Sequence, residues 1–297
     1  MRKVVIITGL TASGKSGLAV NIAKEFNGEI ISADSVQIYK GLNIGSAKVD
    51  NQTMQEIKHH LINIKEFSDT YNVGQFIDDT NIAINAIISQ GKLPIIVGGT
   101  GMYIKALMEG YTLGGTTADS DVRNKYNQLA NEKGNLAVWE ELNKLNPARA
   151  KQVHYNNLKR VIRYLEIELN GEELTKSDSI LKNYEVLCIG IIDNRETIYS
   201  RINQRVDEMM EDGLITEIEN LLAQGANFSM QSFNSIGYKE WEDYFNQVKT
   251  KQETIDLIKQ HTRNYCKRQL TFLKTINNIK LMSLTDADET IRRFLND

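Results

Sequence analysis

Apolar and polar residues alternate near the N-terminus in a way that predicts a strand, a loop and a helix. Residues Lys3–Thr8 enclose an unbroken run of β-branched side chains, which is typical of a buried strand. After a glycine-containing loop, apolar residues return at the spacing of one helical face, until Asn27-Gly28 ends the pattern. The residues of this face are Leu18, Ala19, Ile22, Ala23 and Phe26.

The alternation of strands and helices continues as far as residue 101. Glu29–Ala33 and Leu93–Val97 are expected to form two further buried strands, and Ile77–Ile88 has the periodicity of a helix between them. The second of these strands runs into Gly98-Gly99-Thr100-Gly101. Strands that alternate with helices predict a parallel sheet with helices on both faces.

The strand pattern then fades, and residues from about 115 to 182 are expected to be almost entirely helical. A last strand is expected at Glu185–Ile192, followed by a long helix whose buried face includes Ile198, Ile202, Val206 and Met209. The remainder is expected to be helical to the end. The predicted parts are 1–114 as the first part of an α/β core, 115–183 as a helical insertion, and 184–297 as the return to the core.

Composition indicates a folded protein with no general affinity for nucleic acid. The 297 residues are 41% hydrophobic and carry a net charge of −3, so any binding to nucleic acid must be local. Residues 259–274 hold five basic side chains and no acid, which is either such a surface or an ordinary solvated helix face. The N-terminal apolar run is too short for a signal peptide or a membrane span, which predicts a cytoplasmic protein without a membrane partner.

Neither the cysteines nor the neighbouring histidines predict a metal site. Cys188 and Cys266 lack the Cys-x-x-Cys spacing of a thiolate site, so both are expected to be buried thiols. His59 and His60 are expected to be adjacent in a helix, where neighbours do not share a face. Packing or a local hydrogen bond is the expected role of these two histidines.

A phosphate-binding motif follows the first predicted strand. Gly9-Leu-Thr-Ala-Ser-Gly-Lys-Ser16 matches the P-loop pattern, in which backbone N–H groups and a helix N-terminus surround a diphosphate. Lys15 would add a positive charge, and Ser16 a hydroxyl ligand for Mg²⁺. The fold class is therefore α/β, with a P-loop NTPase-like parallel sheet, helices on both faces and an inserted all-helical domain. The candidate diphosphate-binding residues are Gly9, Leu10, Thr11, Ala12, Ser13, Gly14, Lys15 and Ser16.

A P-loop kinase or ATPase also needs a carboxylate at the end of a neighbouring strand to hold the magnesium shell. Leu93–Val97 ends in glycines instead. Asp193 follows the last predicted strand, where a helix-capping role explains it equally well. Asp34 follows the second strand at its carboxyl end, on the edge of the sheet where ligands of open α/β sheets bind. Asp34 is therefore the acid of most interest.

Further blocks accompany the glycine loop in a fixed order. They are Ser32-Ala-Asp-Ser-Val-Gln-Ile-Tyr39, His59-His-Leu61, Leu93-Pro-Ile-Ile-Val-Gly-Gly-Thr-Gly101, Lys159-Arg-Val-Ile-Arg163, Arg201-Ile-x-x-Arg-Val-Asp-x-Met209, Ile236-Gly-Tyr-Lys-Glu240 and Lys267-Arg-Gln-Leu-Thr271. In order and spacing, over nearly the whole chain, this series resembles the tRNA dimethylallyltransferases of bacteria. Leu10 and Val36 depart from the proline and arginine that are usual in that family.

The resemblance implies a reaction and its participants. Enzymes of this family transfer a dimethylallyl group from dimethylallyl diphosphate to N6 of the adenosine 3′-adjacent to the anticodon in tRNA. The glycine loop would then hold the diphosphate together with Mg²⁺. The implied partners are the tRNA anticodon stem-loop and dimethylallyl diphosphate, and the chain is expected to act as a monomer.

The resemblance also implies roles for individual residues. Asp34 matches the base that takes a proton from the adenine amine, and Thr11 matches a residue near the bridging oxygen of the diphosphate. Arg195 and Arg201 fit arginines around the diphosphate, although ordinary helix-surface arginines would give the same pattern. The implied tRNA-binding residues are Asp34, Ser35, Val36, Gln37, Thr100, Arg123, Lys159, Arg160, Val161, Ile162 and Arg163.

Three other activities would use only some of these residues. An adenylate isopentenyltransferase would modify free AMP or ATP by the same chemistry, but it would not need the basic residues of the insertion. A P-loop small-molecule kinase would transfer a γ-phosphate and depend on Asp193. A non-catalytic RNA-binding module would leave the glycine loop and Asp34 unexplained.

Overall fold

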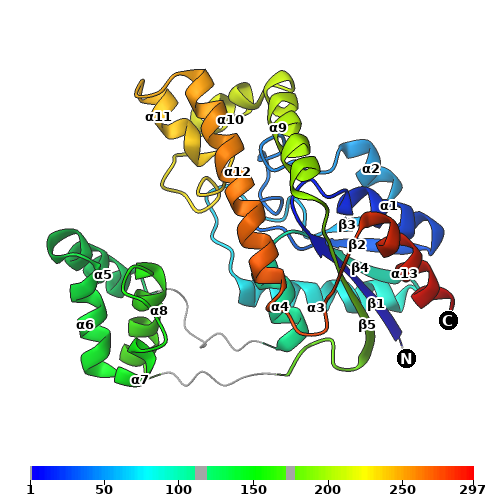
Figure 1. The fold of residues 1–297 in the computed structure, drawn as a ribbon, viewed down its shortest axis with the longest axis horizontal. Helices are drawn as coiled ribbons and strands as arrows, with labels where there is room; N and C mark the ends of the chain where they lie inside the picture. The colour runs from blue at the N-terminus through cyan, green and yellow to red at the C-terminus, as the bar shows by residue number, and fades with distance from the viewer. Residues whose placement is uncertain (1, 111–118, 172–177) are drawn as a thin grey trace. The chain divides into compact units, whose positions relative to one another are not determined.

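The computed structural model describes residues 2–110, 119–171 and 178–297. The chain forms two compact units, one of residues 1–110 with 178–297 and the other of residues 111–177 (Figure 1). The expected start of the insertion at residue 115 lies outside the described residues, as does its expected helical stretch at 172–177. The first unit resumes at Asp178, ahead of the boundary expected at residue 183.

A six-stranded sheet forms the centre of the first unit, in the order β3-β2-β4-β1-β5-β6. All neighbouring strands pair in parallel, so the predicted parallel sheet is confirmed. The longest pairing joins β1 to β5, from Arg2 opposite Tyr184 to Gly9 opposite Ile191. The strands are β1 (Arg2–Gly9), β2 (Gly28–Ser32), β3 (His59–His60), β4 (Leu93–Val97), β5 (Tyr184–Ile191) and β6 (Lys280–Met282).

The two outermost strands, β3 and β6, differ from the sequence-based expectation of helix. They are only two and three residues long, so neither carries an alternating pattern of its own, and each forms by pairing with a buried inner strand. In β3 the His60 ring lies 2.6 Å from Oε2 of Glu29, and Nδ1 of His59 lies 2.7 Å from the carbonyl oxygen of Ile57. A local hydrogen bond, one of the two expected roles, is therefore found for His59, whereas His60 pairs with a residue of the neighbouring strand β2.

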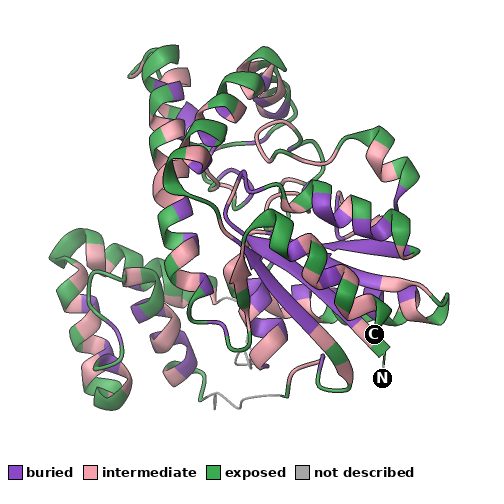
Figure 2. Ribbon diagram, turned by 45° about the vertical axis from the view of Figure 1, so that its right-hand side comes forward, coloured by how far each residue is buried: buried purple, intermediate pink, exposed green. Residues whose placement is uncertain are grey.

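Helices cover both faces of the sheet. Successive side chains of β1 point to opposite faces, so Val5 and Ile7 pack with α1 (Lys15–Glu25) and α13 (Leu284–Asn296). Val4 and Ile6 pack on the other face in a larger core that includes α3 (Val73–Ser89) and α4 (Gly101–Glu109). The four inner strands are accordingly buried along most of their length, whereas the short outer strands β3 and β6 are more exposed (Figure 2).

Two long helices lie against the glycine loop. Leu10 and Ala12 of the loop pack with Ile198 and Ile202 of α9 (Arg195–Glu211) and with Cys266 of α12 (Lys251–Leu273). Both Cys188 and Cys266 are free and buried, as expected. The remaining helices of this unit are α2 (Asn51–Glu56), α10 (Leu214–Ala223), a 3-10 helix at Lys239–Trp241 and α11 (Glu242–Phe245).

The described part of the second unit, residues 119–171, consists of helices joined by short turns. Its core contains Tyr126, Val138, Leu142, Val161 and Leu165. The helices are α5 (Ser120–Lys133), α6 (Asn135–Leu145), α7 (Pro147–Ala150) and α8 (Leu158–Leu169). Counting both units, the structure describes no helix that is long and apolar enough to cross a membrane.

Candidate active site

The glycine loop turns tightly at the carboxyl end of β1. Gly9 has φ +140°, and a Cβ at this position would lie 2.4 Å from the carbonyl oxygen of Ile191. Only glycine therefore allows the loop to leave β1 this close to β5. The chain then passes through Gly14, at φ +85°, into the start of α1, where Nζ of Lys15 donates a hydrogen bond to the carbonyl oxygen of Leu10 at 3.1 Å.

A second loop, after β2, lies against the loop after β4. A Cβ on Gly98 would lie only 2.1 Å from the carbonyl oxygen of Ala33, so glycine is required for this approach. The approach brings Oγ1 of Thr100 within 3.1 Å of the Ser35 backbone nitrogen, which donates a hydrogen bond to it. The strands β2 and β4 thus deliver two polar loops to the same edge of the sheet.

The Asp34 carboxylate is oriented by its own loop. The backbone N–H of Val36 donates a hydrogen bond to Oδ1 at 2.9 Å, and that of Gln37 donates a longer one at 3.4 Å. Among the described residues, none donates a hydrogen bond to Oδ2. One carboxylate oxygen is therefore fixed, and the other remains available to accept a proton.

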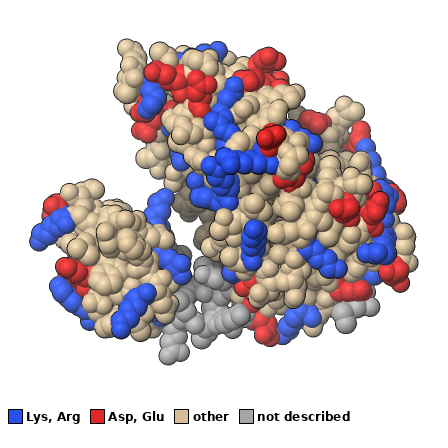
Figure 3. Space-filling model, in the orientation of Figure 1, with Lys and Arg blue, Asp and Glu red and all other residues tan. Residues whose placement is uncertain are grey.

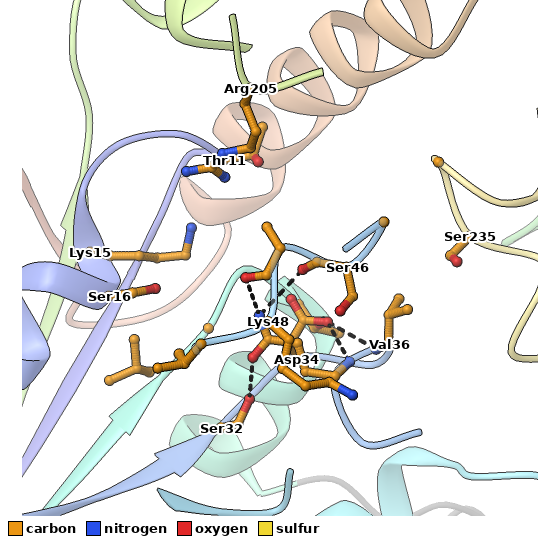
Figure 4. Close-up of a pocket in the computed structure, with 18 of the residues that line it drawn as sticks. Thr11, Lys15, Ser16, Ser32, Asp34, Val36, Ser46, Lys48, Arg205 and Ser235 are labelled. Atoms are coloured by element: carbon orange, nitrogen blue, oxygen red, sulfur yellow. Dashed lines mark hydrogen bonds between the residues drawn. The ribbon is translucent and has the colours of Figure 1, made fainter. Parts of the chain in front are cut away.

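Both loops line one cavity of about 860 Å³. Figure 4 shows Lys15 and Ser16 of the glycine loop on one side, Thr11 and Arg205 above, and Asp34 with Lys48 below them. Tyr265 and Arg268 of α12 also line the cavity. The sequence-predicted residues that line it are Thr11, Lys15, Ser16, Asp34, Ser35, Val36, Gln37 and Thr100.

Three basic side chains, Lys15, Lys48 and Arg205, bring positive charge into this cavity and lose part of their hydration there. Burial and then the nearby Arg205 lower the pKa of Lys15 to about 8, although the Asp34 carboxylate opposes the shift. Burial lowers the pKa of Lys48 to about 8 and also lowers that of Arg205. The nearby carboxylates of Asp34, Glu208 and Glu217 offset this loss of solvation only in part, so the binding of an anion is favoured. The cavity is therefore suited to a multiply charged ligand such as a diphosphate.

Lys48 has a further role in shaping the wall of the cavity. Its ammonium donates hydrogen bonds to the carbonyl oxygen of Tyr39 at 2.7 Å and to the amide oxygens of Asn43 at 3.0 Å and Asn63 at 2.6 Å. These three acceptors lie at separate positions along the segment between β2 and α3. Lys48 therefore holds that segment together beside Asp34.

The other residues predicted for the glycine loop do not line the cavity but shape the loop. Leu10, Ala12 and Ser13 are buried, and Gly9 and Gly14 supply its turns. No described residue gives the buried hydroxyl of Ser13 a hydrogen bond. These residues shape the loop, while Thr11, Lys15 and Ser16 reach the cavity.

Arg195 and Arg201 do not line the cavity, contrary to the role that the resemblance implied for them. Both are exposed on α9. The Arg195 guanidinium lies 5.0 Å from the Tyr199 ring centroid, and Arg201 forms an ion pair with Asp193 at 3.0 Å. The N-cap of α9 is Asn194 rather than Asp193, because the Asn194 side chain accepts a hydrogen bond from the backbone of Thr197.

Arg205 is the arginine of α9 that reaches the cavity, and it was missed in the sequence. Part of the signal was present in the spacing of the buried face. Arg205 lies three residues after Ile202 and four before Met209, so it falls on the same stripe as these two residues. Arg201 lies three residues after Ile198 and four before Arg205, so the spacing alone does not separate these two arginines. An arginine on a buried helix face requires a charged or polar partner.

The candidates on the second unit have different surroundings. Val161 and Ile162 are buried in its core, so their side chains do not reach the surface. Lys159 and Arg160 are exposed at the start of α8. On the face that Figure 3 shows, this unit presents more Lys and Arg than Asp and Glu side chains.

Arg123 and Arg163 both pair with the fully buried Glu166. Arg123 reaches this carboxylate with two nitrogens, at 2.7 and 3.2 Å, and Arg163 reaches it at 3.2 Å. A buried carboxylate requires such partners. Through Glu166, both arginines therefore stabilise the fold of the second unit.

The basic run at 259–274 divides between two surroundings. Lys259 pairs with Asp207 at 2.6 Å, and Arg263 donates a hydrogen bond to Asn203 at 2.6 Å. These two side chains therefore hold α12 against α9. Lys267 and Arg268 are exposed, and Arg268 lines the cavity.

The sequence blocks and the fold agree with one known family. A family model described as IPP transferase matches residues 37–276, which is more than half of the chain. The chain belongs to the IPP transferase family. The recognition made from the sequence blocks is therefore confirmed.

Relatives in the IPP transferase family resemble the chain over most of their length. The tRNA dimethylallyltransferase of Halalkalibacterium halodurans is 40% identical over 291 residues, which cover 96% of this chain and 92% of the relative. That of an Exiguobacterium species is 43% identical, over 91% of this chain and 87% of the relative.

Solved structures of family members show the same fold. The full-length tRNA isopentenylpyrophosphate transferase of Bacillus halodurans matches 100% of this chain and 96% of its own, with a TM-score of 0.74 and 39% identity. The tRNA delta(2)-isopentenylpyrophosphate transferase of Staphylococcus epidermidis gives a TM-score of 0.72 and 36% identity, with coverage of 100% and 99%. The fold class predicted from the sequence is thereby confirmed.

A pH-dependent affinity for diphosphate is expected from the surroundings of Lys15. The free side chain has a pKa of about 8, so it is charged below this pH and becomes neutral above it. Inorganic diphosphate should therefore bind more weakly as the pH rises from 7 to 9, and binding near pH 8 should take up protons, because the anion raises the pKa of Lys15.

Titration calorimetry in buffers of different ionisation enthalpy measures both effects. Diphosphate gains negative charge over the same range, so a loss of affinity must come from the protein. Lys15→Met is the control, since it should bind weakly at every pH and take up fewer protons. An affinity for the unchanged protein that stays constant or rises with pH would contradict the prediction.

Proposed function

We propose that the protein transfers a dimethylallyl group from dimethylallyl diphosphate to N6 of the adenosine 3′-adjacent to the anticodon in tRNA, releasing diphosphate. The observation that carries this proposal is the joint lining of one cavity. Lys15, Ser16 and Arg205 provide anion-binding groups, and Asp34 lies below them in the same cavity, which Thr100 also lines. Membership of the IPP transferase family supports the same reaction.

The reaction breaks one bond and forms another. The carbon–oxygen bond between the dimethylallyl group and the diphosphate breaks, and its electron pair leaves with the diphosphate. The N6 lone pair forms the new carbon–nitrogen bond, and N6 then loses a proton. Asp34 is proposed to accept this proton, and the hydrogen bond from the backbone N–H of Val36 to Oδ1, which leaves Oδ2 available, supports this role.

The leaving diphosphate is stabilised by the anion-binding groups of the cavity. Lys15 and Arg205 bring positive charge that burial makes more effective, and the Thr11 side chain lines the same wall. Groups that are fixed in advance and bind charge as it develops contribute most to such a reaction. Removal of one such group typically costs about 3 kcal/mol of transition-state stabilisation.

Mg²⁺ is proposed as the cofactor that binds with the diphosphate. Among the described residues, no cluster of three or more His, Cys, Asp or Glu could hold a metal ion. The Ser16 hydroxyl, at the first turn of α1, lines the cavity beside Lys15. This donor set fits an ion that keeps several waters and is held largely by substrate phosphates, as Mg²⁺ commonly is. When bound, the ion would neutralise charge on the leaving group.

The polar groups around Asp34 are proposed to receive the adenine. An enzyme that reacts with a base must take it out of the stack and into a pocket. The segment Asp34–Gln37 and the Thr100 side chain offer hydrogen-bonding groups in this part of the cavity. The exposed basic residues of the second unit, Lys159 and Arg160, are proposed to bind tRNA phosphates.

A paired transfer assay tests the proposal. Purified protein with Mg²⁺ would be offered either labelled dimethylallyl diphosphate or γ-labelled ATP, with unmodified tRNA and free AMP as separate acceptors. Label that moves from dimethylallyl diphosphate to tRNA alone is the expected result. Transfer to AMP would identify an adenylate isopentenyltransferase instead. Phosphate transfer from ATP without prenyl transfer would overturn the proposal.

The tRNA surface is tested separately by replacing Lys159 with glutamine. We expect tRNA affinity to fall about threefold to tenfold at low salt, and the slope of log affinity against log salt to decrease by about one phosphate contact. Filter binding across a salt series measures both. Lys144→Gln is the matched control, because Lys144 is also exposed but already pairs with Glu141 at 2.7 Å. Equal salt slopes for the two variants would remove Lys159 from the interface.

The protein is further proposed to act as a monomer in the cytoplasm. The proposed substrate, tRNA, is used in the cytoplasm. Sedimentation of the purified protein with and without tRNA would test the first point, since a stoichiometry other than one to one would contradict it.

A further inference from the structure

Gln269 is a buried polar residue that the reaction described above does not use. It lies on α12, six per cent exposed, close to the cavity. Its side chain makes hydrogen bonds to two loops of the active site. Oε1 accepts a hydrogen bond from the backbone N–H of Thr11 at 2.9 Å, and Nε2 donates one to the carbonyl oxygen of Gly99 at 3.0 Å.

The first hydrogen bond determines which part of Thr11 faces the ligand. Backbone N–H groups of a phosphate-binding loop normally point at the phosphates. In this protein the N–H of Thr11 is directed at Gln269 instead, and Thr11 still lines the cavity. The side chain of Thr11, rather than its amide, is therefore the part of this residue available to the diphosphate.

The second hydrogen bond fixes the loop after β4. Nε2 of Gln269 and Oη of Tyr265, one helical turn earlier on α12, both donate to the carbonyl oxygen of Gly99, at 3.0 and 3.2 Å. The contact is close, since a Cβ on Gly99 would lie 2.8 Å from Nε2 of Gln269. Thr100, the next residue, accepts the hydrogen bond from Ser35. Gln269 therefore constrains the pocket proposed for the base.

We propose that Gln269 is a positioning residue for both substrates. It leaves the Thr11 side chain, rather than its amide, to face the diphosphate, and it holds Gly99 and Thr100 beside the Asp34–Gln37 segment that is proposed to receive the adenine. The amide is suited to this task because it offers one acceptor and one donor in fixed directions. This inference rests on the proposed function for the identity of the substrates.

Gln269→Met tests the proposal, because methionine has nearly the same volume and neither hydrogen-bonding group. The loss of two hydrogen bonds should lower kcat about 10- to 100-fold and raise KM for tRNA about threefold to tenfold. The control is Gln252→Met, the same exchange on the same helix, where the side chain only donates to Asp256 at 3.2 Å on the surface. This control should leave both kinetic parameters within about twofold.

A double-mutant cycle with Thr11→Ala shows whether Gln269 acts through Thr11. In the Thr11→Ala background, Gln269→Met should no longer lower kcat, since the side chain through which it acts is missing. It should still raise KM for tRNA, because that effect passes through Gly99. Equal losses of kcat in the two backgrounds, with KM for tRNA unchanged, would mean that Gln269 only stabilises the fold and would overturn the proposal.

The affinity for inorganic diphosphate is then measured for the same four proteins of the cycle. This measurement tests the role of Gln269 independently of the proposed function. We expect Gln269→Met to weaken binding about threefold in the unchanged background and not in Thr11→Ala. An unchanged protein that binds diphosphate but transfers no prenyl group would overturn the proposed function, while this cycle would still decide the role of Gln269. If the methionine variant does not fold, Gln269→Asn enters the same cycles, since its shorter amide cannot span both partners.

Discussion

Replacement of Asp34 by asparagine is expected to lower turnover by about 10²- to 10⁴-fold, while affinity for tRNA stays within about twofold. Asparagine keeps the shape of the side chain and an oxygen that can accept the Val36 N–H, so the loop should hold its conformation. It cannot accept a proton at neutral pH, and the adenine amine is a weak nucleophile. Single-turnover kinetics with labelled dimethylallyl diphosphate would measure the chemical step directly.

Asp193→Asn is the matched control for this prediction. Asp193 also follows a strand of the sheet, but it pairs with Arg201 and does not line the cavity. We expect less than about threefold loss of turnover from this variant. Full activity of Asp34→Asn would remove Asp34 as the base. A larger loss from Asp193→Asn than from Asp34→Asn would favour the kinase alternative.

Replacement of Arg205 by methionine is expected to lower kcat about 10²- to 10³-fold. The Arg205 guanidinium lines the cavity beside Lys15, close enough to lower the pKa of that lysine. Its removal takes positive charge from the side of the cavity where the leaving group develops negative charge. The same change should raise the pKa of Lys15 toward its ordinary value, so the fall in diphosphate affinity should shift to higher pH.

Arg201→Met provides the comparison on the same helix. Arg201 lies one turn earlier on α9, is exposed, and pairs with Asp193 outside the cavity. An exposed pair of this kind contributes little, so we expect less than about threefold loss of kcat. If the two variants lost activity equally, a general effect of α9 on the fold would explain both results, and the role assigned to Arg205 would be wrong.

The sequence predicted the inner strands and the site loops because each carries a strong local signal. Buried parallel strands such as β1 and β4 are continuous apolar runs, and the glycine loop is a motif with fixed spacing. Asp34 could be placed beside that loop, since the carboxyl ends of parallel strands meet at one edge of the sheet. The order of the strands and the closeness of Gly98 to Ala33 were not accessible from local patterns.

The structural features that were not predicted from the sequence depend mostly on contacts between distant segments. The short strands β3 and β6 exist because an inner strand offers them hydrogen-bonding partners. Gln269 belongs to one of the sequence blocks that resemble the family. Its hydrogen bonds, however, go to two loops that are far from it in the sequence. Arg205 shares a helical stripe with the buried Ile202, whereas the family resemblance pointed to Arg195 and Arg201.

The hydrogen bond between Thr11 and Gln269 joins residues that are 258 positions apart in the sequence. Chains are made from the N-terminus onward, and domains generally fold as units once their sequence is available. The glycine loop is therefore synthesised early, but β5, α9 and α12, against which it packs, follow only after the whole second unit. A nascent chain thus carries its phosphate-binding motif almost from the start of translation and can use it only when nearly all of the sequence has left the ribosome.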